Sequence, residues 1–179
     1  TYKSIKSKIV RNVRIPLKSR MSVVVIYLIT KVFFQAGTWR ALGVAEARKV
    51  HGGLMSGLRG LLRVDCPKCE HKTDNEVIEQ LECLSPLSIV VFLRISLFVR
   101  LLEKNNWTLL VVLCEALPRK GSWLATVYEN LGRLASVDEK LEEMRGVGLD
   151  RWVAAIRHNP TQFRKVLAYS IGRVDVNRV

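Results

Sequence analysis

The sequence predicts an all-α fold, an irregular bundle of about eight to nine helices that begins with a basic N-terminal arm. Apolar residues recur at three- and four-residue steps through most of the 179 residues, which is the spacing of one helix face. Serine, threonine and asparagine stand where several of these stretches begin, as helix caps do. No pair of alternating segments is joined by a hairpin turn, so a β-sheet is not expected.

Residues 17–36 are predicted to form a buried helix, because their apolar density is too high for a surface helix. The β-branched residues 23–26 favour a strand by propensity, but the length of the stretch without a turn signal favours the helix. Gly37 is predicted to end this helix as a C-cap. A second helix is expected over 38–64, where Gly52 and Gly53 indicate a kink, a break or the close approach of another backbone.

Cap signals divide the rest of the chain into shorter helices. Thr73 and Glu76 fit a capping box before a helix that reaches about residue 82, and Pro86 suits the first position of a helix that reaches about residue 104. Further helices are expected at 107–116 and 121–134. Three more are expected to begin at a second capping box of Ser136 and Glu139, at a cap residue Asp150, and at Asn159-Pro160.

Three parts follow from these boundaries and from composition: a basic helical segment over 1–64, a cysteine-containing loop over 65–72, and a C-terminal helical module over 73–179. The first residues carry charges throughout and do not form a signal peptide. The absence of a starting methionine indicates a fragment or a processed chain.

Three apolar runs, at 21–30, 87–102 and 109–117, raise the question of a membrane span. None reaches the roughly 18–20 uncharged residues that a span needs, and Arg94 and Arg100 interrupt the second run. We interpret these runs as buried helices of a soluble bundle and do not expect a membrane partner.

Positive charge is concentrated near the N-terminus. Residues 1–64 contain 13 of the 29 Lys and Arg residues and one acid, Glu46, and so carry +12 of the net charge of +13. Such segregation is typical of a surface that binds a polyanion, although a solvated basic face without a partner is the simpler alternative. The candidate nucleic-acid-binding residues are Lys3, Lys6, Lys8, Arg11, Arg14, Lys18, Arg20, Arg40, Lys49, Arg59 and Arg63, together with Trp39 as a candidate for base stacking.

The other three tryptophans, Trp107, Trp123 and Trp152, are expected to anchor the core, because each stands near a helix start within an apolar run.

Cys66 and Cys69 form a C-x₂-C motif, in which two thiolates can bind one zinc ion. Tetrahedral zinc needs two more ligands, for which His71 and Cys83 are the nearest candidates. No second C-x₂-C or H-x₃₋₅-H follows, so zinc is a possible cofactor and unliganded thiols are the alternative. No other cofactor is expected, and no nucleophile–histidine pattern or phosphate-binding loop indicates an enzyme.

Residues 17–63, with Gly37-Thr38-Trp39 between two helices, resemble the segment that follows the catalytic palm in reverse transcriptases of non-LTR (LINE-like) retroelements. Residues 73–102 and 121–134 resemble later helices of that family, in the same order. The resemblance implies the thumb and post-thumb region, which holds the template–primer duplex. The catalytic signature of the family, an RNA-directed DNA polymerase, ends in two adjacent aspartates. No two aspartates are adjacent in this sequence, so the resemblance implies a chain without a palm and without polymerase activity of its own.

The sequence therefore predicts a nucleic-acid-binding fragment whose partners are an RNA or DNA template–primer and the rest of a reverse transcriptase. It is expected in the nucleus or cytoplasm, with no small-molecule substrate. Two alternatives stay open. One is a small basic membrane-associated protein with 21–36 and 87–102 in or on lipid. The other is an element remnant without a specific function.

Overall fold

The computed structural model describes residues 6–31, 33–65, 72–108, 111 and 121–173. The regular elements in these residues are helices, and none is a strand, which confirms the predicted all-α class. Contacts between residues divide the chain into two units. The N-terminal unit comprises Thr1–Phe34 and Val44–Pro86, and the C-terminal unit comprises Gln35–Gly43 and Leu87–Val179.

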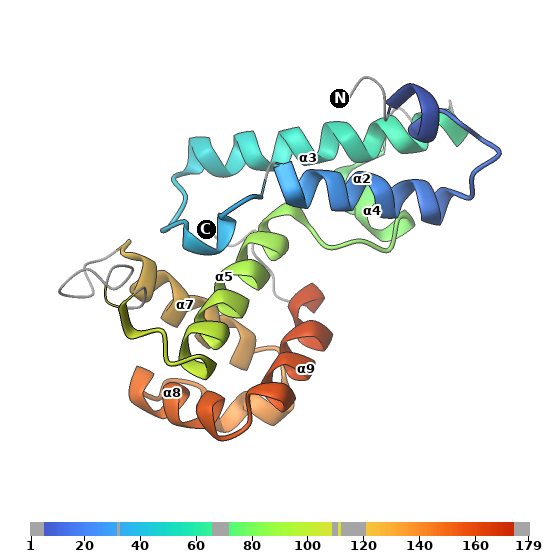
Figure 1. Ribbon diagram of the computed structural model, residues 1–179. Helices are drawn as coiled ribbons and strands as arrows, with labels where there is room; N and C mark the ends of the chain where they lie inside the picture. The colour runs from blue at the N-terminus through green and yellow to red at the C-terminus, as the bar shows by residue number, and fades with distance from the viewer. Residues whose placement is uncertain (1–5, 32, 66–71, 109–110, 112–120, 174–179) are drawn as a thin grey trace. The chain divides into compact units, whose positions relative to one another are not determined.

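The N-terminal unit is built on two long helices, α2 (Leu17–Lys31) and α3 (Val44–Asp65), which lie side by side (Figure 1). The helical turn η1 (Lys6–Val10) contacts both, and α4 (Asp74–Gln80) packs on α3. The sequence-based division placed residues 74–80 in the C-terminal module, whereas their contacts place them here. The side chains buried in this unit include Val10, Val24, Leu54, Leu58, Leu61 and Val77.

The C-terminal unit contains α5 (Pro86–Glu103), α7 (Trp123–Ala135), η4 (Glu139–Met144), α8 (Leu149–His158), α9 (Pro160–Ser170) and η5 (Ile171–Arg173). Its core contains Trp123 edge-on to Phe98, with ring centroids 6.1 Å apart, and Trp152 edge-on to Phe163 at 6.2 Å. Both tryptophans are buried, as expected. Trp107 is not, because it is 52% exposed and stacks under the guanidinium of Arg157 at 4.8 Å.

The apolar run at 87–102 forms most of α5 and supplies the core of the C-terminal unit with Ile95, Phe98 and Val99. Within the described parts of the chain, no helix combines the length and the hydrophobicity that crossing a membrane requires. The predicted helix at 107–116 lies outside the described residues except for 107, 108 and 111. Of the predicted loop 65–72, only the two end residues are described.

Three of the helix starts predicted from cap signals are confirmed, and one of them is Pro86, the first residue of α5. The hydroxyl oxygen of Thr73 accepts a bond from the Glu76 amide, and the Glu76 carboxylate accepts one from the Thr73 amide at 2.6 Å. The bond from the Thr73 amide to the carboxylate lowers the pKa of Glu76, and so does a second bond to it from the Thr73 hydroxyl at 2.8 Å. The side chain of Asn159 accepts a bond from the Gln162 amide at 3.0 Å, with Pro160 in the first turn.

The capping box of Ser136 and Glu139 and the cap at Asp150 are wrong. Ser136 ends α7, and Asp138 is the residue that caps η4, through a 2.9 Å bond from the Lys140 amide. The second carboxylate oxygen of Asp138 accepts a bond from the Ser170 hydroxyl. This partner lies 32 residues away, so the local sequence pattern carries no sign of it. The N-cap residue of α8 is Gly148, and Asp150 lies in the first turn of that helix.

Gly37 is not a C-cap. Helix α2 ends at Lys31, Gln35 takes the left-handed conformation (φ 63°), and Gly37 lies in the short helix η2 (Ala36–Thr38). A Cβ atom at Gly37 would stand 2.9 Å from the backbone oxygen of Leu93. Glycine is required here because two backbones approach closely, not because a helix ends.

The helix predicted over 38–64 begins only at Val44. The preceding residues are held by α5, since Arg94 donates to the carbonyl oxygens of Trp39 and Arg40 at 2.8 and 3.0 Å. The expectation at Gly52 and Gly53 is also wrong in part. Helix α3 runs through both without a break, and apart from the adjacent residues and the backbone of α3 itself no described atom lies within 4 Å of a Cβ built at either.

These glycines give opposite expectations for substitution by alanine. Gly52→Ala should raise the free energy of unfolding by about 1 kcal/mol, because alanine is the better helix former and its methyl group meets open space. Gly37→Ala should lower it by about 1–3 kcal/mol, because the methyl group collides with the Leu93 backbone. Urea unfolding followed by far-UV circular dichroism measures both. Equal effects of the two substitutions on the free energy of unfolding would contradict the different surroundings described for Gly52 and Gly37.

Candidate nucleic-acid interface

One side of α3 carries four basic residues and forms what we call the α3 basic face: Arg48, Lys49, Arg59 and Arg63. Since each residue of an α-helix turns about 100° around the helix axis, these four side chains fall within an arc of about 100° around that axis. The opposite side of α3 is apolar and buried, with Leu54, Met55, Leu58, Leu61 and Leu62. Burial of these five side chains fixes the orientation of the helix, so the basic side is directed away from the packed side.

Small residues separate the charges on this face. Gly52 and Ser56 lie between Arg48 and Arg59 on the same side of the helix, and both are exposed. Arg48, Lys49 and Arg63 are exposed as well, whereas Arg59 is half-buried. Neither Arg48 nor Lys49 has a hydrogen-bond or ion-pair partner among the described residues. A flat, cationic helix face of this kind can be approached closely by a polyanion.

The inner edge of the α3 basic face is joined to α4. The Arg59 guanidinium lies 2.5 Å from Asp74 Oδ1 and donates to the carbonyl oxygen of Lys72 at 3.1 Å. The other Asp74 oxygen lies 2.6 Å from His51 Nε2. Asp74 therefore neutralises part of the charge of Arg59 and joins α3 to the start of α4. His51 and Asp74 are 23 residues apart, and no local pattern in the sequence indicates their contact.

A second group of cations lies on η1, α2 and the turn between them. Lys8, Arg11, Arg14 and Lys18 are all exposed, as expected for residues that contact phosphates. Lys31, at the end of α2, is exposed too.

Arg20 is a correction to the predicted set, because it is only 1% exposed. Its NH2 group donates to both oxygens of Asp65 at 2.6 and 2.7 Å, NH1 donates to the Val10 carbonyl at 3.0 Å, and Nε to the Ile15 carbonyl at 2.8 Å. A guanidinium held this way has no surface left for a phosphate. Arg20 joins the N-terminal segment, α2 and the end of α3.

Trp39 and Arg40 belong to the C-terminal unit and are not part of the α3 basic face. Trp39 is half-buried and Arg40 is exposed. Lys3, Cys66, Cys69 and His71 lie outside the described residues, as does the side chain of Lys6.

The fourth candidate zinc ligand, Cys83, is half-buried, and burial raises the pKa of its thiol. Among the residues that the structure describes, no group of three or more His, Cys, Asp or Glu side chains is placed to hold a metal ion. Since three of the four predicted ligands are not described, the zinc site stays a prediction.

These features define an all-α chain with an exposed cationic helix face. Comparison with known proteins finds no matching family model, no matching curated protein and no matching solved structure.

Proposed function

We propose that this chain binds nucleic acid without sequence preference, through the α3 basic face and the exposed cations of η1 and α2. The observation that carries the proposal is the state of Arg48 and Lys49, which are exposed and have no acidic partner among the described residues. Cations in this state can contact phosphates and displace the counterions that are condensed on the nucleic-acid backbone. Gly52 and Ser56, which lie between Arg48 and Arg59, are small and exposed, so they leave room for that backbone to reach the helix.

The resemblance to non-LTR reverse transcriptases makes the proposal more specific. On that basis the chain is the thumb and post-thumb part of such an enzyme, holds the RNA or DNA template–primer, and contacts the rest of the polymerase. It has no polymerase activity of its own and acts inside the cell, in the nucleus or cytoplasm.

The double substitution Arg48→Ala, Lys49→Ala should weaken binding of a DNA duplex and of an RNA–DNA hybrid. Each lost phosphate contact removes about 0.9 from the slope of log K against log salt, so the slope should become shallower by about 1.8. Filter binding between about 50 and 200 mM salt measures it.

A matched control removes the same charge from the other unit. Arg100 and Lys104 lie on and just after α5 and are both exposed, so Arg100→Ala, Lys104→Ala should leave the slope unchanged. A salt-independent affinity of the unsubstituted chain, or equal slopes for the two double variants, would contradict the proposal.

One observation favours a second candidate, a small basic membrane-associated protein. Ile26 and Phe34 in the N-terminal unit are 61% and 68% exposed, in a segment flanked by cations. Apolar and basic residues together are typical of helices that lie on an anionic lipid surface. Cell fractionation separates the candidates, because recovery only in detergent would favour the membrane and recovery in a high-salt extract would favour nucleic acid.

A further inference from the structure

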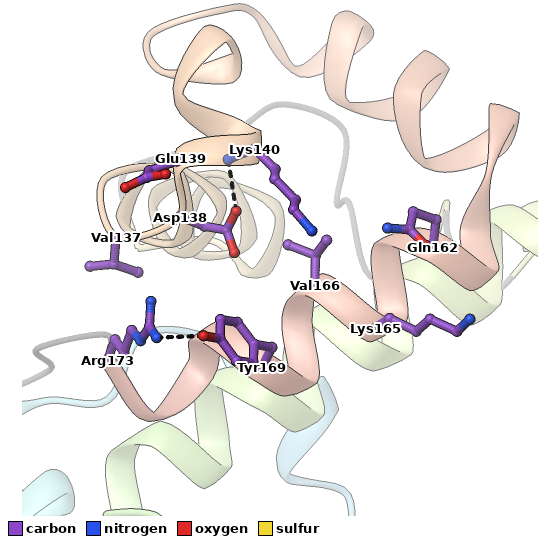
Figure 2. Close-up of a pocket in the computed structure, with 9 residues that line it drawn as sticks. All are labelled: Val137, Asp138, Glu139, Lys140, Gln162, Lys165, Val166, Tyr169 and Arg173. Atoms are coloured by element: carbon purple, nitrogen blue, oxygen red, sulfur yellow. Dashed lines mark hydrogen bonds between the residues drawn. The ribbon is translucent and has the colours of Figure 1, made fainter.

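A groove between η4 and α9 has a volume of about 600 Å³ and carries basic, amide and aromatic side chains (Figure 2). Gln162, Lys165, Val166 and Tyr169 come from one side of α9, and Arg173 continues that side into η5. Lys140 extends from η4 toward Val166. The groove lies entirely within the C-terminal unit, so it shares no residue with the α3 basic face.

Three cations line the groove beside two acids, and neither acid faces the cations freely. Asp138 is 8% exposed, and its oxygens accept bonds from the Lys140 amide and the Ser170 hydroxyl. Glu139 extends away from Lys140 (Figure 2). The ammonium groups of Lys140 and Lys165 have no hydrogen-bond or ion-pair partner in the described part of the chain. This end of the groove therefore attracts an anion.

The other end of the groove is aromatic. Tyr169 is 69% exposed, which is unusual for a ring of this size in a helix that also supplies core residues. Its hydroxyl accepts a 2.8 Å bond from Arg173 NH2, and the Arg173 guanidinium lies over the ring at 4.6 Å from its centroid. These two contacts hold the ring in one orientation at the surface. A fixed aromatic ring beside a planar cation is a stacking platform for a nucleobase.

We propose that this groove binds a nucleotide unit, with the base stacked on the Tyr169–Arg173 pair and the phosphate held by Lys140 and Lys165. Lys165 and Tyr169 are four residues apart on α9, about 6 Å along the helix axis, so one ligand can reach both. The Gln162 amide adds a donor and an acceptor at the phosphate end. The nucleotide is either free or part of a single strand, since both present the same base and phosphate.

Isothermal titration calorimetry of the full chain with adenosine 5′-monophosphate measures the affinity and tests the proposal. The nucleotide should bind more tightly than adenosine or inorganic phosphate alone. Tyr169→Ala and the double variant Lys140→Ala, Lys165→Ala should each weaken binding about tenfold. Tyr169→Phe, which keeps the ring but loses the hydroxyl bond from Arg173, should weaken binding less than Tyr169→Ala does. Lys104→Ala, an exposed lysine outside the groove, should leave the affinity within about twofold of the original.

Titration with a short single-stranded oligoadenylate distinguishes the two sources of the ligand. Tighter binding of the oligonucleotide, with the same loss in Tyr169→Ala, assigns the groove to a single strand, and equal binding assigns it to a free nucleotide. No heat of binding at millimolar nucleotide, or equal affinities in all variants with unchanged thermal midpoints, would overturn the proposal. The variant Arg48→Ala, Lys49→Ala should bind the mononucleotide normally, so failure here is distinct from failure of the α3 basic face.

Discussion

Replacement of Arg20 by alanine is expected to lower the free energy of unfolding of the N-terminal unit by about 3–5 kcal/mol, the usual effect of removing one partner of a buried ion pair. The side chain of Arg20 is 2% exposed and that of Asp65 30% exposed. The substitution leaves the Asp65 carboxylate without its cation, and it also leaves the carbonyl oxygens of Val10 and Ile15 without their donor. Three segments of the unit lose their common partner at once.

The four tryptophans of the chain allow the affected unit to be identified, because all of them lie in the C-terminal unit. Arg20→Ala should shift the urea transition seen by far-UV circular dichroism more than the transition seen by tryptophan fluorescence. Arg48→Ala, an exposed arginine of the same unit, should change stability by no more than about 0.5 kcal/mol. A small effect of both substitutions would mean that Arg20 is a surface cation after all, as its place in the sequence indicated.

Arg94→Ala is expected to lower the free energy of unfolding of the C-terminal unit by about 2–4 kcal/mol. Arg94 is 3% exposed and donates to the carbonyl oxygens of Trp39 and Arg40, and these two part-buried bonds would be lost. Burial lowers the pKa of Arg94 to about 10, although the negative charge of Glu129 acts to raise it. The side chain is therefore still protonated at neutral pH, and its desolvation offsets part of what its hydrogen bonds contribute.

Tryptophan fluorescence during urea unfolding measures this change directly, because the reporters lie in the affected unit. Arg94→Met keeps most of the side-chain volume and removes the desolvation cost, so its loss should be about 1 kcal/mol smaller than that of Arg94→Ala. Arg100→Ala, on the exposed side of the same helix, is the control. A loss equal to that of the control would show that the segment 35–43 does not depend on Arg94.

Helix content and several helix ends were accessible from the sequence because they depend on neighbours three or four residues apart. The capping box at Thr73, the cap at Asn159 and the helix expected over 121–134, which is α7, all belong to this class. The segment 35–43 does not. Its carbonyl oxygens are satisfied by Arg94 and by the indole of Trp123, which donates to Gly37 at 2.6 Å. These donors lie 54 to 86 residues away, so the local pattern favoured a helix up to residue 36 and a second helix from residue 38.

The candidate interface divides in the same way. The sequence located the positive charge in the first third of the chain, and the α3 basic face lies there. It could not separate Arg20 from Arg48, since both are arginines in a basic segment and only the fold brings Asp65 to one of them. The groove of Lys140, Lys165 and Tyr169 had no signal in the sequence, because η4 and α9 are separate elements whose side chains meet only after folding.

By itself, then, the sequence determined the all-α class, the approximate positions of most described helices and the sign and placement of the charge. These depend on side-chain period, caps and composition, all of which are local. Tertiary structure alone decided which cations are buried in ion pairs, which carbonyl oxygens of residues 35–43 are bonded, and which side chains line a common groove. A buried donor takes whichever acceptor the packed helices bring within about 3 Å, and that distance is set by the fold rather than by separation along the chain.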